Sequence, residues 1–298
     1  MKKILLAGST GFIGKHLISY LTENGYELSV LTRRRLKDTP NVKYFQWDVE
    51  KGFIDDKAFE NVDTIINLTG ANIGVKRWIE KRKKEIVNSR VDSINLLYDY
   101  VSKDHYPIKS FISASATGYY GAVTTDQIFT EESKSGNDFL ASVSQKWEDT
   151  ARQFENIGCR LVILRQGVVL GKDSGIYQKM TSLASKGINP AVGNGKQYLP
   201  WIDVRDLVRL YAFALENEVI KGVFNAVSSE QITMNEFAQK LSKSIDKNSI
   251  LPNAPSFLVR LALGEMSSMV LEGSRVSNQK IKESDFTFLY DNLEKSLQ

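Results

Sequence analysis

The chain has 298 residues, of which 42% are hydrophobic and 25% are charged. This apolar content can offset the conformational entropy lost on folding and excludes global disorder, and the length favours one large α/β unit, alone or with a small appendage. The formal net charge of +4 is spread along the chain, so it does not by itself indicate a nucleic-acid partner.

Residue types that build disulfides and metal sites are scarce. The chain has one cysteine, Cys159, and two histidines, His16 and His105. This excludes an intramolecular disulfide and leaves little for a zinc site or a Ser-His-Asp triad. No metal is expected, and Cys159 is expected to be buried and inert.

The chain shows no pattern typical of export or of a membrane span. The apolar run 4–7 that follows Lys2 and Lys3 stops at Gly8, which is too short for the hydrophobic part of a secretory signal. No stretch approaches the roughly 18 apolar residues of a transmembrane helix. We therefore expect a cytoplasmic protein with neither a membrane nor a nucleic acid as its partner.

The first 171 residues alternate between short apolar runs and amphipathic stretches. Strands are predicted at 3–7, 27–31, 42–47, 63–68, 109–115 and 160–165, and helices at 12–23, about 78–102 and 139–156. This alternation is typical of a doubly wound parallel sheet of the Rossmann type. Right-handed crossovers then bring the carboxyl ends of the strands to one edge, where ligands bind.

The regular alternation ends near Gly171. A helix at 204–217, a strand at 223–227 and a helix at 234–244 follow, and prolines then open a last segment. We predict a nucleotide-binding core over 1–171, to which about 201–230 returns. A smaller substrate-side region would comprise 172–200 and 231–298, of which 250–298 is a distinct C-terminal segment.

A glycine-rich loop joins the first strand to the first helix. It reads GSTGFIG at 8–14. Glycines in this context allow a tight turn and the close approach of the backbone to a pyrophosphate at the start of a helix. The contacts expected from this loop are Gly8, Thr10, Gly11, Phe12, Ile13 and Gly14.

The end of the second strand favours NADP over NAD. It reads Thr32-Arg33-Arg34-Arg35, with no acid before Asp38, whereas NAD-binding proteins usually place an acid there. Thr32, Arg33 and Arg34 would hold the 2′-phosphate of NADP(H), with Arg33 as the main contact. The alternative is a solvated basic turn.

Two further segments complete the expected cofactor site. Asp48 could accept a hydrogen bond from the adenine amine or serve only as a turn carboxylate. After the fourth strand, small residues in the segment 67–72 would let the chain pass under the cofactor, with contacts from Leu68, Thr69, Gly70 and Ala71.

Five segments together resemble the short-chain dehydrogenase/reductase superfamily in its extended, epimerase/dehydratase-like branch. They are GSTGFIG at 8–14, NLTGAN at 67–72, SASATGYYG at 113–121, LRQGVVLG at 164–171 and PWIDVRDL at 200–207. A narrower likeness is to the atypical subgroup called epimerase family protein. It is carried by ANIG at 71–74, RW at 77–78 and SRV at 89–91, and by a C-terminal segment with LP at 251–252 and LEGSRV at 271–276.

The resemblance implies roles for several residues. Arg165, Gly167 and Val168 would line the nicotinamide, and Ser115 would bind the substrate oxygen. The family's Tyr-x-x-x-Lys pair is missing from the helix at 139–156. Counting back from Lys146 gives Ser142 and Lys146 at the two positions, whereas alignment on Glu148 gives Leu140 and Ser144. Arg90 stands where the family has an asparagine.

Other groups could replace the missing acid. Tyr119 and Tyr120 follow Ser115, and one of them could donate the proton if Arg90 or Lys146 lay close by; both rings could equally be loop packing. The basic stretch 76–84 could attract an anionic substrate or be the solvated face of a helix. Asp203 is as suited to capping the next helix as to closing over a substrate.

Together these features predict an NADP(H)-binding oxidoreductase or epimerase-like enzyme. Its substrate would be a small carbonyl or alcohol compound, and the basic stretch 76–84 allows for an anionic one. The rival hypothesis is a catalytically silent NADPH-binding regulator or partner-binding protein, which the loss of the tyrosine-lysine pair favours. A nucleotide-sugar epimerase rests on fold analogy alone. The oligomeric state is left open.

Overall fold

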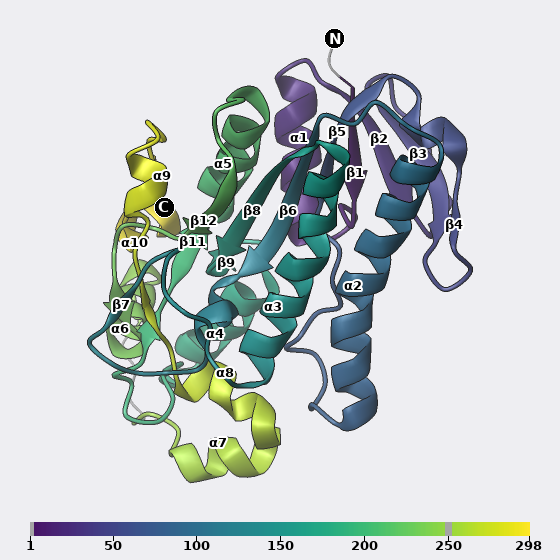
Figure 1. Ribbon diagram of the computed structural model, residues 1–298. Coiled ribbons are helices and arrows are strands. Elements are labelled where there is room, and N and C mark those ends of the chain that lie inside the picture. The colour runs from purple at the N-terminus through teal and green to yellow at the C-terminus, as the bar shows by residue number, and fades with distance from the viewer. Residues whose placement is uncertain (1–2, 248–251) are drawn as a thin grey trace.

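The computed structural model describes residues 3–247 and 252–298, so Lys2 and Leu251 lie outside the described residues. Its centre is an eight-stranded sheet with helices on both faces (Figure 1). The spatial order is β12-β8-β6-β5-β1-β2-β3-β4, and every neighbouring pair is parallel except β3 and β4. In chain order the strands are β1 (Lys3–Ala7), β2 (Glu27–Thr32), β3 (Val42–Asp48), β4 (Phe53–Ile54), β5 (Val62–Asn67), β6 (Ser110–Ala116), β8 (Arg160–Gln166) and β12 (Gly222–Ala226).

The strand order confirms the doubly wound parallel sheet. From β1 the chain moves outward through β2 and β3, and from β5 it moves the opposite way through β6, β8 and β12. The direction therefore reverses between β1 and β5. In an open α/β sheet, such a switch point leaves a crevice beyond the carboxyl ends of the strands, where ligands bind.

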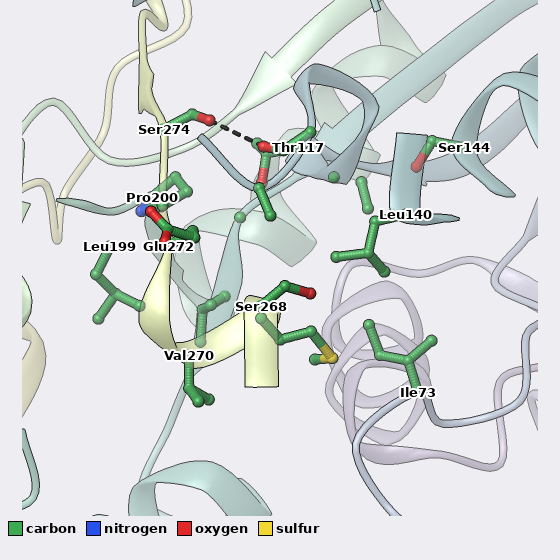
Figure 2. Close-up of a pocket in the computed structure, with 18 of the residues that line it drawn as sticks. Ile73, Thr117, Leu140, Ser144, Leu199, Pro200, Ser268, Val270, Glu272 and Ser274 are labelled. Carbon is green, nitrogen blue, oxygen red and sulfur yellow. Dashed lines mark hydrogen bonds between the residues drawn. The ribbon is translucent and has the colours of Figure 1, made fainter. Parts of the chain in front are cut away.

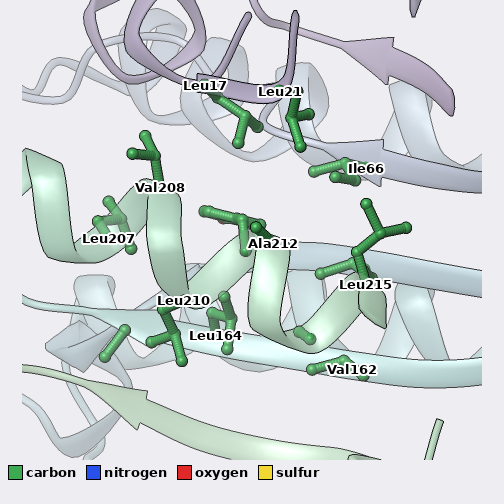
Figure 3. Close-up of a cluster of buried hydrophobic side chains, with 14 of the residues drawn as sticks. Leu17, Leu21, Ile66, Val162, Leu164, Leu207, Val208, Leu210, Ala212 and Leu215 are labelled. Carbon is green, nitrogen blue, oxygen red and sulfur yellow. The ribbon is translucent and has the colours of Figure 1, made fainter. Parts of the chain in front are cut away.

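One face of the sheet is covered by α1 (Phe12–Glu23) and α5 (Val204–Glu216). Figure 3 shows Leu17 and Leu21 of α1 directed toward the apolar side of α5 and toward strand residues such as Ile66. Apolar residues of α5 recur at helical spacing, which places them on this one buried face. Because β12 pairs with β8 and α5 packs on α1, residues 204–226 belong to the same layered unit as β1.

The other face is covered by α2 (Glu80–Lys103) and α3 (Phe139–Ala151). Both helices differ from their predicted bounds. Trp78 precedes α2, where its ring is buried and its indole nitrogen donates to the Ile73 carbonyl at 2.9 Å. The predicted helix 139–156 ends at Ala151 and tightens into a 3-10 segment, Arg152–Ile157, which Gly158 terminates at a φ of 79°.

The remaining elements pack against the carboxyl side of the sheet. α4 (Gly175–Ser185), α6 (Met234–Ser244) and α10 (Leu293–Leu297) share a core with Trp201 and Phe237. Short strand pairs connect this region: β9 (Val168–Leu170) with β11 (Trp201–Asp203), β10 (Tyr198–Leu199) with β13 (Ile232–Thr233), and β7 (Ile128–Phe129) with β14 (Arg275–Val276). The last helices before α10 are α7 (Ser256–Leu263), α8 (Ser268–Leu271) and α9 (Gln279–Lys282).

No helix in residues 3–247 and 252–298 is long and apolar enough to cross a membrane. Cys159 is buried as predicted, and its thiol donates to the Ile108 carbonyl at 3.0 Å. Asp203 caps α5, since its carboxylate accepts from the backbone N–H of Arg205 at 2.8 Å. The capping role predicted for Asp203 is thus confirmed.

Candidate functional site

The glycine loop lies where the fold requires small residues. Gly8 has a φ of 75°, and a Cβ there would lie 2.5 Å from the backbone nitrogen of Thr69. A Cβ on Gly14 would lie 2.2 Å from the Cα of Ser9. Any larger side chain at these two positions would push the loop away from the segment after β5 or from the start of α1. The loop is therefore pressed against the switch point of the sheet.

The start of α1 offers backbone donors to an anion. Its N-cap is Gly11, which has no side chain to cap the free N–H groups of the first turn, and no acid lies in that turn. Gly11 is exposed, and Thr10, Phe12 and Ile13 are half-buried. Free N–H groups and the positive end of the helix dipole suit a diphosphate. The residues present thus fit the dinucleotide that the motif predicts.

The segment after β5 holds its polar side chains inward. The hydroxyl of Thr69 bonds to the Asn67 amide oxygen at 2.7 Å and to the Ser93 hydroxyl at 2.6 Å. The backbone nitrogen of Leu68 donates to the Ala7 carbonyl at 2.8 Å, which joins the segment to β1. The segment is thus fixed beside the glycine loop, with Gly70 and Ala71 following at the crevice.

The three arginines after β2 are exposed and uncommitted. Arg33, Arg34 and Arg35 form no ion pair with a described residue. They border a hollow of about 260 Å³ together with Thr32, whose hydroxyl accepts from the Arg34 backbone nitrogen at 3.1 Å. Guanidinium groups without ion pairs beside a hollow favour the phosphate-binding interpretation over that of a solvated basic turn.

Asp48 has a local partner. One carboxylate oxygen accepts from the backbone nitrogens of Glu50 and Lys51, at 3.1 and 3.3 Å, and the other lies 3.5 Å from the Lys51 ammonium. These contacts favour the turn-carboxylate alternative over a contact with adenine.

A buried polar network joins the carboxyl ends of β6 and β8 to α3. The Glu148 carboxylate of α3 accepts hydrogen bonds from Nε and Nη2 of Arg165, each at 2.8 Å. It also accepts one from the Ser115 hydroxyl at 2.7 Å. Arg165 also donates to the Tyr120 hydroxyl at 3.0 Å, and Tyr120 donates to the Asn225 amide oxygen at 2.6 Å. We call these five residues the sealed network. Each is at most 3% exposed, so their hydrogen-bond partners lie within the protein and not in solvent.

The sealed network changes the roles expected for Ser115, Tyr120 and Arg165. The Ser115 hydroxyl is committed to Glu148, and the Tyr120 hydroxyl is committed to Asn225 and Arg165. Burial raises the pKa of Tyr120 to about 12, although Arg165 acts in the opposite direction. The Tyr119 ring stacks against the Arg165 guanidinium, whose Cζ lies 3.3 Å from the ring centroid. This geometry favours structural roles for these residues over substrate, proton-donor or nicotinamide contacts.

A cavity of about 260 Å³ opens beside the network, beyond the ends of β6 and β8 (Figure 2). We call it the substrate cavity, after the role that is proposed for it below. One wall is α3, and the opposite wall is the C-terminal stretch 268–274. Gly167, Val168 and Arg90 line it, whereas Ser115, Tyr119, Tyr120 and Arg165 do not.

The structure decides between the two alignments of α3. Leu140 and Ser144 line the substrate cavity, and Figure 2 shows both on the α3 side. Ser142 is half-buried and Lys146 is exposed, and neither lines the cavity. Their place in the cavity favours the alignment on Glu148, which gives Leu140 and Ser144 at the positions of the family's tyrosine and lysine. Neither of these residues is an acid or a base near neutral pH.

Arg90 is the charged side chain at the inner side of the cavity. It is 8% exposed, and its Nη1 donates to the carbonyls of Ile86 at 2.8 Å and Ala71 at 3.3 Å. Its guanidinium lies over the Trp147 ring, 4.7 Å from the centroid. Burial, with a smaller effect from Arg82, lowers the pKa of Arg90 to about 10. No carboxylate among the described residues forms an ion pair with it.

Two cations of the basic stretch 76–84 form ion pairs with nearby acids. Lys83 lies 2.6 Å from Glu265 and 3.5 Å from Glu80, and Arg82 lies 2.6 Å from Glu85. These pairs favour the helix-face alternative.

Several cavity residues were not singled out from the sequence. They are Thr117, Gln197, Tyr198, Glu272 and Ser274. The LEGSRV segment did carry a signal, because it was part of the resemblance, but nothing in it indicated that Glu272 would line this cavity. Among residues 3–247 and 252–298, no group of three or more His, Cys, Asp or Glu side chains could hold a metal ion.

The fold, the glycine loop and the uncapped α1 define a Rossmann-type dinucleotide-binding protein. The model of the NAD dependent epimerase/dehydratase family matches residues 4–226, and the chain belongs to this family. A domain of unknown function matches residues 254–298. An epimerase family protein of Mycobacterium leprae is 33% identical over 99% of this chain and 94% of its own length.

Two solved structures extend the comparison. The human epimerase family protein SDR39U1, solved with NADPH, has a TM-score of 0.86 at 29% identity, over 99% of this chain and 97% of that one. A nucleoside-diphosphate sugar epimerase from Corynebacterium glutamicum has a TM-score of 0.79 at 26% identity, over 99% of this chain and 57% of that one. The NADPH in the human structure agrees with the cofactor predicted here.

Proposed function

We propose that this protein is a cytoplasmic NADP(H)-dependent oxidoreductase or epimerase-like enzyme of the atypical, extended short-chain dehydrogenase/reductase kind, acting on a small carbonyl or alcohol compound. The observation that carries the proposal is the crevice at the switch point. There the Gly8 loop lies against the backbone at Thr69, α1 begins without a side-chain cap, and Arg33–Arg35 are exposed and form no ion pair with a described residue. The NADPH bound to the human relative supports the choice of cofactor.

A nicotinamide bound in this crevice would supply or accept a hydride. The chain's own contribution is to bind and orient. The α1 N-terminus would hold the diphosphate, and the Arg33 side chain would hold the 2′-phosphate. Thr117 and Ser144 would offer hydroxyls to a substrate oxygen in the cavity, and residues of the stretch 268–274 form one wall of it.

The cofactor proposal is tested at Arg33. Losing a charged hydrogen bond costs roughly 1.5–3 kcal/mol, so Arg33→Ala should weaken NADPH binding about 10- to 100-fold. NADH binding should stay unchanged, because NADH lacks the 2′-phosphate. Both affinities are measured by fluorescence titration. Lys37→Ala removes one exposed positive charge nearby and is the matched control. Equal affinity of the unaltered protein for NADPH and NADH would contradict the proposal.

A second candidate function is NADPH binding without turnover. It is favoured by Leu140 and Ser144, which stand in the cavity where an acid and its activating lysine would be. The purified protein is loaded with NADPH and mixed with a panel of carbonyl compounds while the absorbance of the reduced nicotinamide is followed. Oxidation by a member of the panel supports the enzyme, and persistent binding without oxidation supports the second candidate.

A further inference from the structure

We propose that the substrate cavity is a binding site for an organic monocarboxylate with an apolar body, and that Arg90 holds its carboxylate. The inference names the substrate class for the proposed function and rests on it. It is carried by a buried arginine that has no counterion and by the apolar walls that surround it.

One edge of the Arg90 guanidinium makes no hydrogen bond to a described residue. Both of its described hydrogen bonds come from Nη1, to the carbonyls of Ile86 and Ala71. Its Nε is buried and has no partner among the described residues, and the same holds for the indole nitrogen of Trp147 beneath it. The Nε–Nη2 edge of a guanidinium matches the two oxygens of a carboxylate. The edge that suits a carboxylate thus makes no hydrogen bond to a described residue, although it packs beside Gly70.

The charge of Arg90 also lacks compensation. Buried charges in proteins are normally paired, because an isolated ion in a medium of low polarity is costly. The neighbouring Arg82 is as deeply buried but lies 2.6 Å from Glu85. At Arg90 the described neighbours include two neutral carbonyls, the Trp147 ring and Gly70, and no described carboxylate pairs with it. A bound anion would supply the missing opposite charge.

The rest of the cavity determines what kind of anion fits. Among the described residues that line it, Arg90 carries the only positive charge and Glu272 the only negative one. The remaining walls are mainly apolar: Ile73, Leu140, Val143, Leu199, Met269 and Val270. One cation in an apolar space of about 260 Å³ suits one carboxylate on a compact apolar body. A nucleoside diphosphate sugar would bring two negative charges and a much larger polar surface.

The test uses full-length protein saturated with NADPH. Phenylpropionate and hexanoate are titrated by isothermal calorimetry, each beside its neutral amide, and UDP-glucose is titrated as the competing class. We expect both carboxylates to bind at least about 10-fold more tightly than their amides, since charged hydrogen bonds are worth roughly 1.5–3 kcal/mol. Equal binding of acid and amide, no binding of either acid, or preference for UDP-glucose would overturn the proposal.

Substitution at Arg90 assigns the effect to this residue. Arg90→Met should weaken carboxylate binding about 10- to 100-fold with NADPH affinity retained. Arg82→Met removes an equally buried arginine that does not line the cavity, and it should leave carboxylate binding unchanged. Where Arg90→Met fails to fold, Arg90→Lys keeps the charge without the fork, and it should still bind several-fold more weakly than the unaltered protein. Unchanged affinity in the folded Arg90 variant would overturn the proposal.

The same titrations separate this inference from the proposed function. They are repeated on protein freed of nucleotide. Carboxylate binding that depends on Arg90 but occurs in a protein unable to bind NADPH would refute the cofactor proposal and leave the pocket assignment standing. NADPH binding without any carboxylate binding would do the reverse.

Discussion

Two buried arginines lie near the carboxyl edge of the sheet, and their surroundings differ. Arg165 of β8 lies in the sealed network, where its Nε and Nη2 donate to the two carboxylate oxygens of Glu148, each at 2.8 Å. Arg90 of α2 borders the substrate cavity and meets only carbonyls and the Trp147 ring. Burial alone would lower the pKa of either guanidinium. At Arg165 the Glu148 carboxylate outweighs burial and raises the pKa, whereas at Arg90 burial prevails and lowers the pKa to about 10.

The contrast separates structure from function at a single edge of the sheet. A charge whose hydrogen bonds are all made within the protein holds elements together, and here the sealed network links β6, β8 and β12 to α3. Asn225 of this network also donates to the Ser277 carbonyl at 2.9 Å, which attaches the C-terminal segment. A charge whose hydrogen bonds are incomplete is available to a ligand.

The largest expected effect is at Glu148. Glu148→Ala leaves Arg165 buried without its counterion, which should lower the free energy of unfolding by about 3–5 kcal/mol. Urea denaturation measures the change. The control is Glu155→Ala, which breaks the exposed pair with Arg152 at 4.0 Å and should cost no more than about 1 kcal/mol. Equal small losses in the two variants would show that the network does not stabilise the fold.

A smaller effect is expected at Tyr120. Tyr120→Phe deprives Asn225 and Arg165 of a buried partner and should cost about 1–3 kcal/mol of stability. NADPH affinity and any rate of NADPH oxidation should stay unchanged, because Tyr120 lies outside the substrate cavity. Tyr119→Phe is the control, since the Tyr119 hydroxyl bonds to no described residue. A large loss of turnover at unchanged stability would instead support a role for Tyr120 as proton donor.

The smallest expected effect concerns the Cys159 thiol, whose reactivity should depend on pH. Burial raises the pKa of its thiol to about 11 from the ordinary 9.0. At about pH 8 the folded chain should therefore hold roughly 100-fold less thiolate than the unfolded chain and react correspondingly more slowly with iodoacetamide.

The same shift acts on stability. Between about pH 9 and pH 11 the unfolded chain loses the thiol proton first, so the free energy of unfolding should fall as the pH rises. Cys159→Ala should show a smaller alkaline decrease in the urea midpoint. Identical decreases in the two proteins would assign the effect to other groups.

Much of the cofactor side could be predicted because its determinants are local. The pattern GSTGFIG after an apolar run specifies a strand, a tight turn and a helix start within a few residues, and the structure has β1, the Gly8 loop and α1 at those places. The exposed arginines after β2 likewise follow from adjacent residues. The role of Asp48 remained open, because a carboxylate at this place can bind adenine or accept from the backbone of the next few residues. In the structure it accepts from the backbone nitrogens of Glu50 and Lys51.

The substrate side could not be predicted to the same depth. Ser115 occupied the family's position, but its hydroxyl bonds to Glu148, 33 residues further on. The family comparison left two alignments of α3 open, because both place plausible residues four apart. Only the packing of α3 on the sheet shows that Leu140 and Ser144 face the cavity.

The order of strands and helices, the glycine loop and the free arginines follow from the sequence by itself, since hydrophobic period and turn chemistry act over a few neighbouring residues. Which polar groups have partners was decided by the tertiary structure alone. Glu148 neutralises Arg165 and none of the described acids neutralises Arg90, because the pairing of a buried charge depends on which distant elements the fold brings into contact with it.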